Sequence, residues 1–134
     1  MAGEDVATYL AKALESLEGA ESELANRRYN NCANRCYYAC FQAAIAALLA
    51  EGIQARSTKG HWRHQTIHAT FVEQLIKRRR IYPPSLRSVL AELMLLRQDA
   101  DYETDRVSRK QATRAVRRSR EFVEAIRLRE GTQR

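Results

Sequence analysis

Arg97, Asp101 and Tyr102 are the polar side chains whose types and spacing point most directly to chemistry. They lie in the segment LLRQDADY (residues 95–102), at the C-terminal end of a predicted helix. Arg97 falls on the otherwise apolar face of this helix, at the i, i+3 and i+4 spacing of buried positions. A guanidinium keeps its charge and is costly to bury without a partner. We therefore predict an anionic partner for Arg97. This partner is one of three: Asp101 one turn further on, a group of a neighbouring subunit, or a bound phosphate.

The histidines are the candidate general bases. His61, His64 and His68 are the only histidines in the chain, and an unperturbed imidazole titrates near neutral pH. His64 and His68 stand one helical turn apart and could also chelate a metal, but no acidic residue or cysteine close by in sequence completes a closed site. We therefore predict no metal site. Whether these histidines cap and pair structurally or act on a substrate stays open.

The cysteines Cys32, Cys36 and Cys40 recur every four residues on one face of a predicted helix. At the rise of an α-helix, Cys32 and Cys40 are about 12 Å apart, which is too far for one tetrahedral zinc ion. We therefore expect reduced cysteines that pack in the core as small apolar side chains.

The same helix carries the segment NRCYYACF (residues 34–41), which combines a charge with aromatic rings. Adjacent side chains point about 100° apart on a helix. One of Tyr37 and Tyr38 can therefore face the core, with its hydroxyl hydrogen-bonded, while the other faces a partner. Arg35 is expected to pair with an acidic residue at the end of the later helix, such as Asp99 or Asp101. Because one carries a positive charge and the other an aromatic ring, Arg35 and Tyr38 are also candidates for binding nucleic acid or a nucleotide.

The charge of the chain is unevenly distributed. Residues 1–55 carry 4 basic and 7 acidic residues and residues 56–134 carry 19 basic and 9 acidic residues, so the net charge of +7 comes from the second part. Such asymmetry is typical of a protein with a polyanionic partner, with nucleic acid ahead of membrane. The alternative is a solvated face on arginine-rich helices. Arg114 and Arg118 on the last predicted helix are further candidates for contacts with RNA.

Several function classes find no support in the sequence. Glycine-rich phosphate loops, nucleophile elbows and paired zinc-ligand motifs are absent, and many enzymes depend on them. No run of 18 apolar residues occurs, so we expect no membrane span and no membrane partner. The acidic start, MAGED, has no signal-peptide pattern, so we expect a cytoplasmic protein. We also expect no cofactor.

The elements that must position these residues are helical. Ala, Leu, Arg and Glu dominate, and strand-type runs are absent, which favours an all-α domain. We expect one domain over residues 1–134, with a core over about 5–128, folded as a four- to five-helix up-and-down bundle. The second helix is apolar nearly all round and is expected at the centre. The expected helices cover residues 5–26, 29–51, 61–77, 84–103 and 108–130, with Gly52 as a stop and Ser108 as a cap.

Several segments together resemble the HEPN-domain family. The segments NRCYYACFQAA (34–44) and ALLAEGI (47–53) resemble the second helix of these proteins. His64, with Phe71 seven residues later, resembles the start of their third helix, and LRQDADY (96–102) resembles the R-x-x-A-D-Y ending of their fourth. The match runs in order over about residues 5–128 and points to the small stand-alone prokaryotic branch.

The resemblance implies an α-helical bundle that forms a two-fold homodimer. In many HEPN proteins the fourth helix carries R-x(4–6)-H, and the arginine and histidine of both subunits cleave RNA without a metal. Many such proteins are toxins that are partnered with a small nucleotidyltransferase antitoxin. Arg97 matches the arginine, but Tyr102 stands where the histidine is expected. An ordinary tyrosine has a pKa near 10 and is a poor base at neutral pH.

Two functions follow as expectations. The first is a dimeric HEPN-like protein that binds RNA or a nucleotide in a toxin–antitoxin or defence pair. Its metal-independent endoribonuclease activity would use Arg97 to bind phosphate, with Asp101, Tyr102 or His64 assisting. The second is a catalytically inert module in which Arg97 and Asp101 hold the dimer, and the arginine-rich last helix docks a nucleotidyltransferase, another protein or nucleic acid. Tyr102 is also a candidate acceptor of a nucleotidyl group from such an antitoxin.

Overall fold

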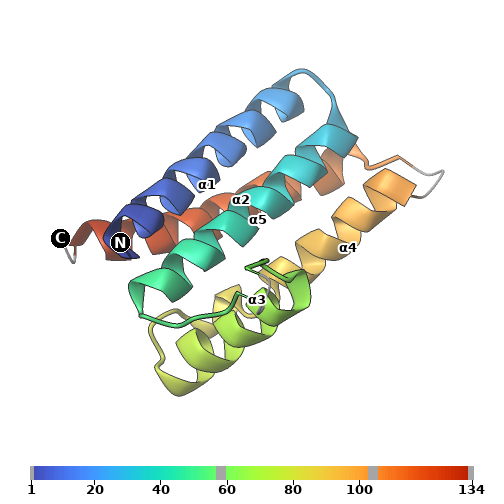
Figure 1. Ribbon diagram of the computed structural model, residues 1–134. Helices are drawn as coiled ribbons and strands as arrows, with labels where there is room; N and C mark the ends of the chain where they lie inside the picture. Colours follow the sequence, from blue (N-terminus) through green and yellow to red (C-terminus); the bar gives the residue numbers. More distant parts are fainter. Residues whose placement is uncertain (1, 57–59, 103–105, 133–134) are drawn as a thin grey trace.

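The fold is an up-and-down bundle of α-helices, as the sequence predicts. The computed structural model describes residues 2–56, 60–102 and 106–132. Its elements, in chain order, are α1 (Ala2–Ala25), α2 (Tyr29–Ala50), α3 (His64–Thr70), η1 (Phe71–Arg78), η2 (Pro84–Leu86), α4 (Val89–Tyr102) and α5 (Arg109–Thr132). Helices α1, α2 and α5 lie side by side along the length of the molecule, and α4 runs along the other side of α2 (Figure 1). No described helix is long and apolar enough to cross a membrane.

Helix α2 is the centre of the bundle because it contacts α1, α3, α4 and α5. Alanines and other small side chains cover much of its surface, which lets the neighbouring helices approach closely. An interior helix of this kind is apolar on all sides, and this pattern predicted its position correctly. The buried side chains of α2 are those of Cys32, Ala33, Cys36, Tyr37, Ala39, Cys40, Phe41, Ala43, Ala44, Ile45, Ala46, Ala47 and Leu48.

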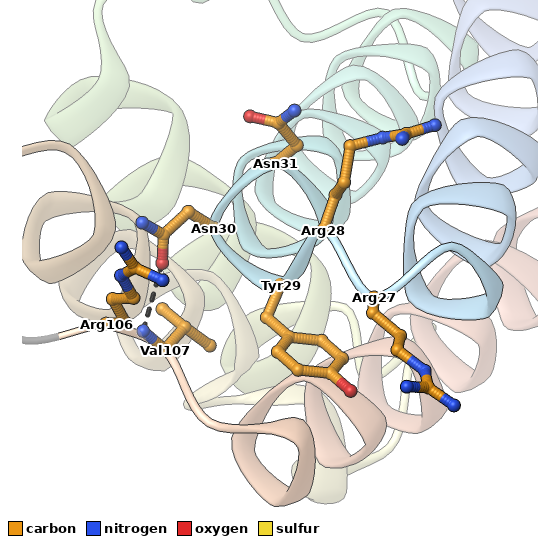
Figure 2. Close-up of a pocket in the computed structure, with 7 residues that line it drawn as sticks. All are labelled: Arg27, Arg28, Tyr29, Asn30, Asn31, Arg106 and Val107. Carbon is orange, nitrogen blue, oxygen red and sulfur yellow. Dashed lines mark hydrogen bonds between the residues drawn. The ribbon is translucent and has the colours of Figure 1, made fainter.

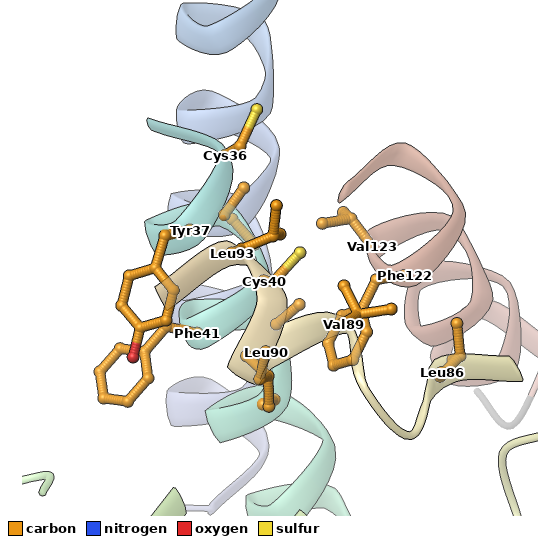
Figure 3. Close-up of a cluster of buried hydrophobic side chains, with 14 of the residues drawn as sticks. Cys36, Tyr37, Cys40, Phe41, Leu86, Val89, Leu90, Leu93, Phe122 and Val123 are labelled. Atoms are coloured by element: carbon orange, nitrogen blue, oxygen red, sulfur yellow. The ribbon is translucent and has the colours of Figure 1, made fainter. Parts of the chain in front are cut away.

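The cysteines of α2 belong to the hydrophobic core. Cys40 extends towards Val123 of α5 (Figure 3). All three cysteines are free and fully buried. Burial raises the pKa of the Cys40 thiol, because the thiolate loses its hydration there. The prediction of reduced core cysteines is confirmed.

Local signals in the sequence place most helix ends. Ser108 and Gln111 form a reciprocal cap at the start of α5. The backbone N–H of Gln111 donates to Ser108 Oγ at 3.1 Å, and the backbone N–H of Ser108 donates to Gln111 Oε1 at 2.9 Å. This pairing satisfies two of the amides that a helix start leaves open. Gly52 follows α2 with a φ of +71°, in the left-handed region that glycine adopts without cost. Helix α5 continues to Thr132, slightly beyond its predicted end.

The third and fourth helices differ from their predicted bounds. The third begins at His64 and not at His61, because Trp62 is held outside the helix. The indole Nε1 of Trp62 donates to the Tyr9 hydroxyl at 2.7 Å, and its backbone forms an isolated bridge with Arg56. From Phe71 onward the helix widens into the π-helical η1.

The fourth predicted helix is divided. Pro84 opens the short 3-10 turn η2, and α4 itself begins at Val89. Its predicted end, Glu103, lies outside the described residues. The apolar face predicted for this helix is buried at Leu86, Leu90 and Leu93.

Candidate functional site

Arg97 lies on α4 against the two tyrosines of α2. Its guanidinium carbon is 5.1 Å from the centre of the Tyr38 ring and 5.7 Å from that of Tyr37. The side chain is 19% exposed, so part of it stays accessible to a ligand. The negative faces of aromatic rings attract cations, which explains how an arginine is accommodated on an apolar helix face.

Asp101, one of the three anionic partners that the sequence left open for Arg97, forms an ion pair with it. Arg97 Nε lies 3.7 Å from Asp101 Oδ2, which makes an ion pair but is too long for a hydrogen bond. The Nε atom is buried and has no hydrogen-bond partner among the described residues. The charge of Arg97 is therefore only loosely neutralised by Asp101.

Asn34 joins Asp101 to the central helix. Its side-chain amide donates to both carboxylate oxygens of Asp101, at 3.2 and 3.3 Å. The end of α4 is thereby tied to the N-terminal half of α2. Sequence reasoning did not select Asn34, although it lies one turn before Tyr38 on α2.

Arg35 does not pair with an acid, and that prediction is wrong for the part of the chain that the structure describes. Its guanidinium carbon lies 5.5 Å from the centre of the Tyr38 ring. Its aliphatic carbons lie beside Gly19 of α1, so close that a Cβ added to this glycine would contact them. The ion pairs between described residues include none from Arg35. The physical reason is that Asn34, about 100° away around the helix, occupies the face of α2 that meets Asp101. Arg35 therefore turns towards α1, and Tyr38 has a guanidinium from two helices near its ring.

His64 and His68 meet the buried hydroxyl of Tyr37. The Tyr37 oxygen lies 2.6 Å from His64 Nδ1 and 2.8 Å from His68 Nε2. The His64 ring also stacks on Phe41, with centroids 4.4 Å apart. The structural pairing that the sequence left open is confirmed. His61 is exposed and precedes α3.

Both paired histidines are uncharged near neutral pH. Burial, and then the positive charge of Arg97, lowers the pKa of His64. Burial, and then the proximity of His64, lowers the pKa of His68 to about 4. Burial raises the pKa of Tyr37 and keeps its proton in place. The site thus presents a fixed cation, Arg97, beside neutral imidazoles that can accept or donate a proton.

The other residues predicted for the site lie apart from it or are not described. Tyr102 ends α4, but its side chain lies outside the described part of the chain, so its role stays a prediction. Arg114 and Arg118 line a separate cavity of about 250 Å³ between α4 and α5. Arg118 forms ion pairs there with Glu92 at 3.8 Å and Glu121 at 3.7 Å. These two arginines do not converge on Arg97.

A pocket rich in arginine lies at the turn between α1 and α2 (Figure 2). Its volume is about 530 Å³, and its lining residues are Arg27, Arg28, Tyr29, Asn30, Asn31, Arg106 and Val107. Figure 2 shows the guanidinium groups pointing in different directions, and that of Arg28 pairs with Glu23 at 2.8 Å. This pocket therefore lacks the convergence of an anion site. No group of three potential metal ligands occurs among the described residues.

Comparisons with known proteins agree with this architecture. No curated protein matches the chain. The family model of the HEPN domain matches residues 6–129, which is nearly the whole chain and includes every residue described above at the face between α2, α3 and α4. The protein therefore belongs to the HEPN domain family.

Proposed function

We propose that this HEPN protein binds single-stranded RNA at the face formed by α2, α3 and α4 and cleaves it slowly without a metal. The observation that carries the proposal is that Arg97 and His64 lie against the same pair of tyrosines. A phosphate held by Arg97 is therefore near an imidazole that is neutral at physiological pH. Tyr38 is half-exposed and supplies a ring on which a base can stack.

The chemistry is an internal transesterification of the RNA backbone. His64 accepts the proton of the ribose 2′-hydroxyl on Nε2, and the 2′-oxygen forms a bond to phosphorus. The bond from phosphorus to the 5′-oxygen breaks, and that oxygen takes a proton from water. The products are a 2′,3′-cyclic phosphate and a 5′-hydroxyl. Arg97 stabilises the negative charge that builds on the phosphate oxygens in the transition state.

The proposal extends to the assembly and the setting of the protein. We place it in the cytoplasm as a homodimer, in a toxin–antitoxin or defence pair with a nucleotidyltransferase. The resemblance of the segments around Tyr38 and Arg97 to the family motifs supports this assignment. The positive charge of the second part of the chain fits a polyanionic partner, and Tyr102 is the proposed acceptor of a nucleotidyl group.

The test is incubation of the purified protein with labelled RNA in the presence of EDTA. Cleavage with a 2′,3′-cyclic phosphate product is expected from the unsubstituted protein and not from Arg97→Ala or His64→Gln. Arg109→Ala, an exposed arginine at the start of α5, is the matched control and should cleave normally. RNA with 2′-deoxyribose at the cleaved nucleotide should remain intact. Cleavage that requires a divalent metal, or equal cleavage by Arg97→Ala, would contradict the proposal.

The second candidate is an inert binding module. The ion pair of Arg97 with Asp101, itself held by Asn34, favours it, because these contacts give Arg97 a structural role. In that case the same assay shows no cleavage by the unsubstituted protein. Binding of RNA that is lost in Arg97→Ala would then define the site as one that binds without cutting.

A further inference from the structure

A buried hydrogen-bonded chain connects the two imidazoles of α3 through the central helix. The Tyr37 hydroxyl lies within hydrogen-bond distance of His64 Nδ1, at 2.6 Å, and of His68 Nε2, at 2.8 Å. The Tyr37 side chain is fully buried. A phenol has one proton to donate and can also accept. One imidazole must therefore accept the proton of Tyr37, and the other must donate its own N–H to the phenol oxygen.

The chain has two possible directions, and each fixes both imidazoles. In the first direction His64 Nδ1–H donates to Tyr37, and Tyr37 donates to His68 Nε2. Both histidines then carry their hydrogen on Nδ1, and Nε2 of His64 presents a lone pair. In the reverse direction both histidines carry their hydrogen on Nε2, and His64 presents an N–H. The two rings therefore share one tautomer and can change it only together.

Packing fixes the orientation of the His64 ring as well. The ring stacks on Phe41 at a centroid distance of 4.4 Å and on Tyr37 at 5.5 Å. Its Nδ1 is used by Tyr37, and its Nε2 has no hydrogen-bond partner among the described residues. Nε2 is thus the nitrogen left for a substrate.

We propose that Tyr37 and His68 are positioning residues for His64, because they fix its ring and couple its tautomer to that of His68. The inference rests on the proposed function in one respect, namely that His64 transfers a proton to or from RNA. In the first direction of the chain, Nε2 accepts the 2′-hydroxyl proton, and the Nδ1–H of the resulting imidazolium stays donated to Tyr37. In the reverse direction, the same nitrogen is a hydrogen-bond donor to a phosphate. Reversal of the chain changes the role of His64 Nε2 from acceptor to donor, and the change of tautomer itself adds no charge beside Arg97.

The direct test is nitrogen-15 NMR of the two histidines at neutral pH. Two-bond couplings between ring nitrogens and carbon-bound protons report which nitrogen carries the hydrogen. We expect one common tautomer for His64 and His68 in the unsubstituted protein and unequal tautomer populations in Tyr37→Phe. Tyr82→Phe is the matched control, because it removes another buried hydroxyl, one that has no hydrogen-bond partner among the described residues. It should leave both tautomers unchanged. If Tyr37→Phe does not fold, His68→Leu tests the same coupling through the signal of His64.

Opposite tautomers in the unsubstituted protein would overturn the inference. Tautomer populations that stay the same in Tyr37→Phe, or in His68→Leu if that variant is used, would also overturn it. This readout does not need RNA, so it separates the inference from the proposed function. If the unsubstituted protein leaves RNA intact, the proposed function fails and the NMR result still decides whether the chain exists.

Kinetics test the consequence for catalysis. His68→Leu should lower kcat about tenfold and leave KM within about twofold, because the role proposed for His68 is to position His64 and not to bind RNA. His68→Gln should restore most of the activity, since an amide can also donate to or accept from the Tyr37 hydroxyl. Equal activity of His68→Leu and the unsubstituted protein, or a loss that appears only in KM, would contradict a positioning role.

Discussion

Arg97 and Arg35 approach the ring of Tyr38 from two different helices, with guanidinium carbons 5.1 and 5.5 Å from its centre. Each cation is attracted to the aromatic ring, but the two positive charges repel one another. An anion bound near both would relieve that repulsion. This arrangement favours a phosphate ligand at the half-exposed Tyr38.

Replacing Tyr38 should weaken RNA binding. Stacking of a base on an aromatic side chain contributes about 1–3 kcal/mol, so Tyr38→Leu should raise the Kd for single-stranded RNA about tenfold. Tyr38→Phe keeps the ring and should bind nearly as well as the unsubstituted protein. Fluorescence anisotropy with a labelled oligonucleotide measures both. An unchanged Kd for a folded Tyr38→Leu variant would exclude stacking on this ring.

Asp101 should compete with RNA for Arg97. Its carboxylate lies 3.7 Å from Arg97 Nε, and Asp101→Asn removes that negative charge while it keeps a side chain of similar shape. The variant should bind RNA several-fold more tightly. Its stability should change by about 1 kcal/mol or less, because the ion pair is long and its two side chains are partly exposed. Asp99→Asn removes an exposed charge two residues away and is the control. If both variants gain equally, the effect is one of net charge alone.

The salt dependence of binding should identify the arginine that holds phosphate. Each neutralised phosphate of a single strand adds about 0.7 to the slope of log K against log salt. Arg97→Ala should therefore weaken binding to RNA of any sequence and reduce the slope by about that amount. Arg114→Ala should have a smaller effect, because Arg114 lines the separate cavity between α4 and α5. A larger loss with Arg114→Ala would move the binding site to that cavity.

Acid should destabilise the protein through the paired histidines. The pKa of His68 is about 4 in the folded protein, against an ordinary value of 6.5. Between these values the unfolded chain binds more protons than the folded one, so the free energy of unfolding falls as pH decreases from about 6.5 to 4. The loss is on the order of 2 kcal/mol after allowance for partial exposure of the ring. His64, whose pKa is also lowered, adds in the same direction.

Urea unfolding at several pH values measures this dependence. His68→Gln has no imidazole to charge at that position, so it should lose less stability on acidification than the unsubstituted protein. The carboxylates titrate in both proteins, and the difference between them isolates His68. Parallel pH profiles would show that His68 is not held neutral by the fold.

Phe71 should be one of the side chains on which stability depends most. It is fully buried, its ring stacks on Tyr82 with centroids 5.6 Å apart, and it lies 5.0 Å from the centroid of Phe122. Truncation of a buried phenylalanine to alanine costs about 3–5 kcal/mol, so Phe71→Ala should lower the free energy of unfolding by that amount. Leu95, which is 63% exposed, gives the contrast, since Leu95→Ala should change stability by less than about 0.5 kcal/mol. Equal effects in chemical unfolding would contradict the described core.

The sequence predicted those parts of the fold that depend on local physics. The apolar surface of α2 placed that helix at the centre, because a helix without a polar face has to be covered on all sides. Ser108 and Gly52 marked helix ends because capping and positive φ depend on a few neighbouring residues. The bounds of α3 were predicted less well, because Trp62 is held by the distant Tyr9 and not by its neighbours.

In the candidate site, too, the sequence predicted the local contacts and the tertiary structure decided the distant ones. The sequence by itself determined that Arg97 would need an anionic partner and that Asp101 stood one turn away, since helical spacing brings i and i+4 together. Only the tertiary structure decided that Asn34 would hold Asp101, that Arg35 would turn towards α1, and that Tyr37 would join His64 to His68. The hydrogen bonds among these contacts join residues 27 to 67 positions apart in the chain. Helical periodicity relates positions within a few turns of one helix, whereas the packing of one helix against another decides which of its side chains meet.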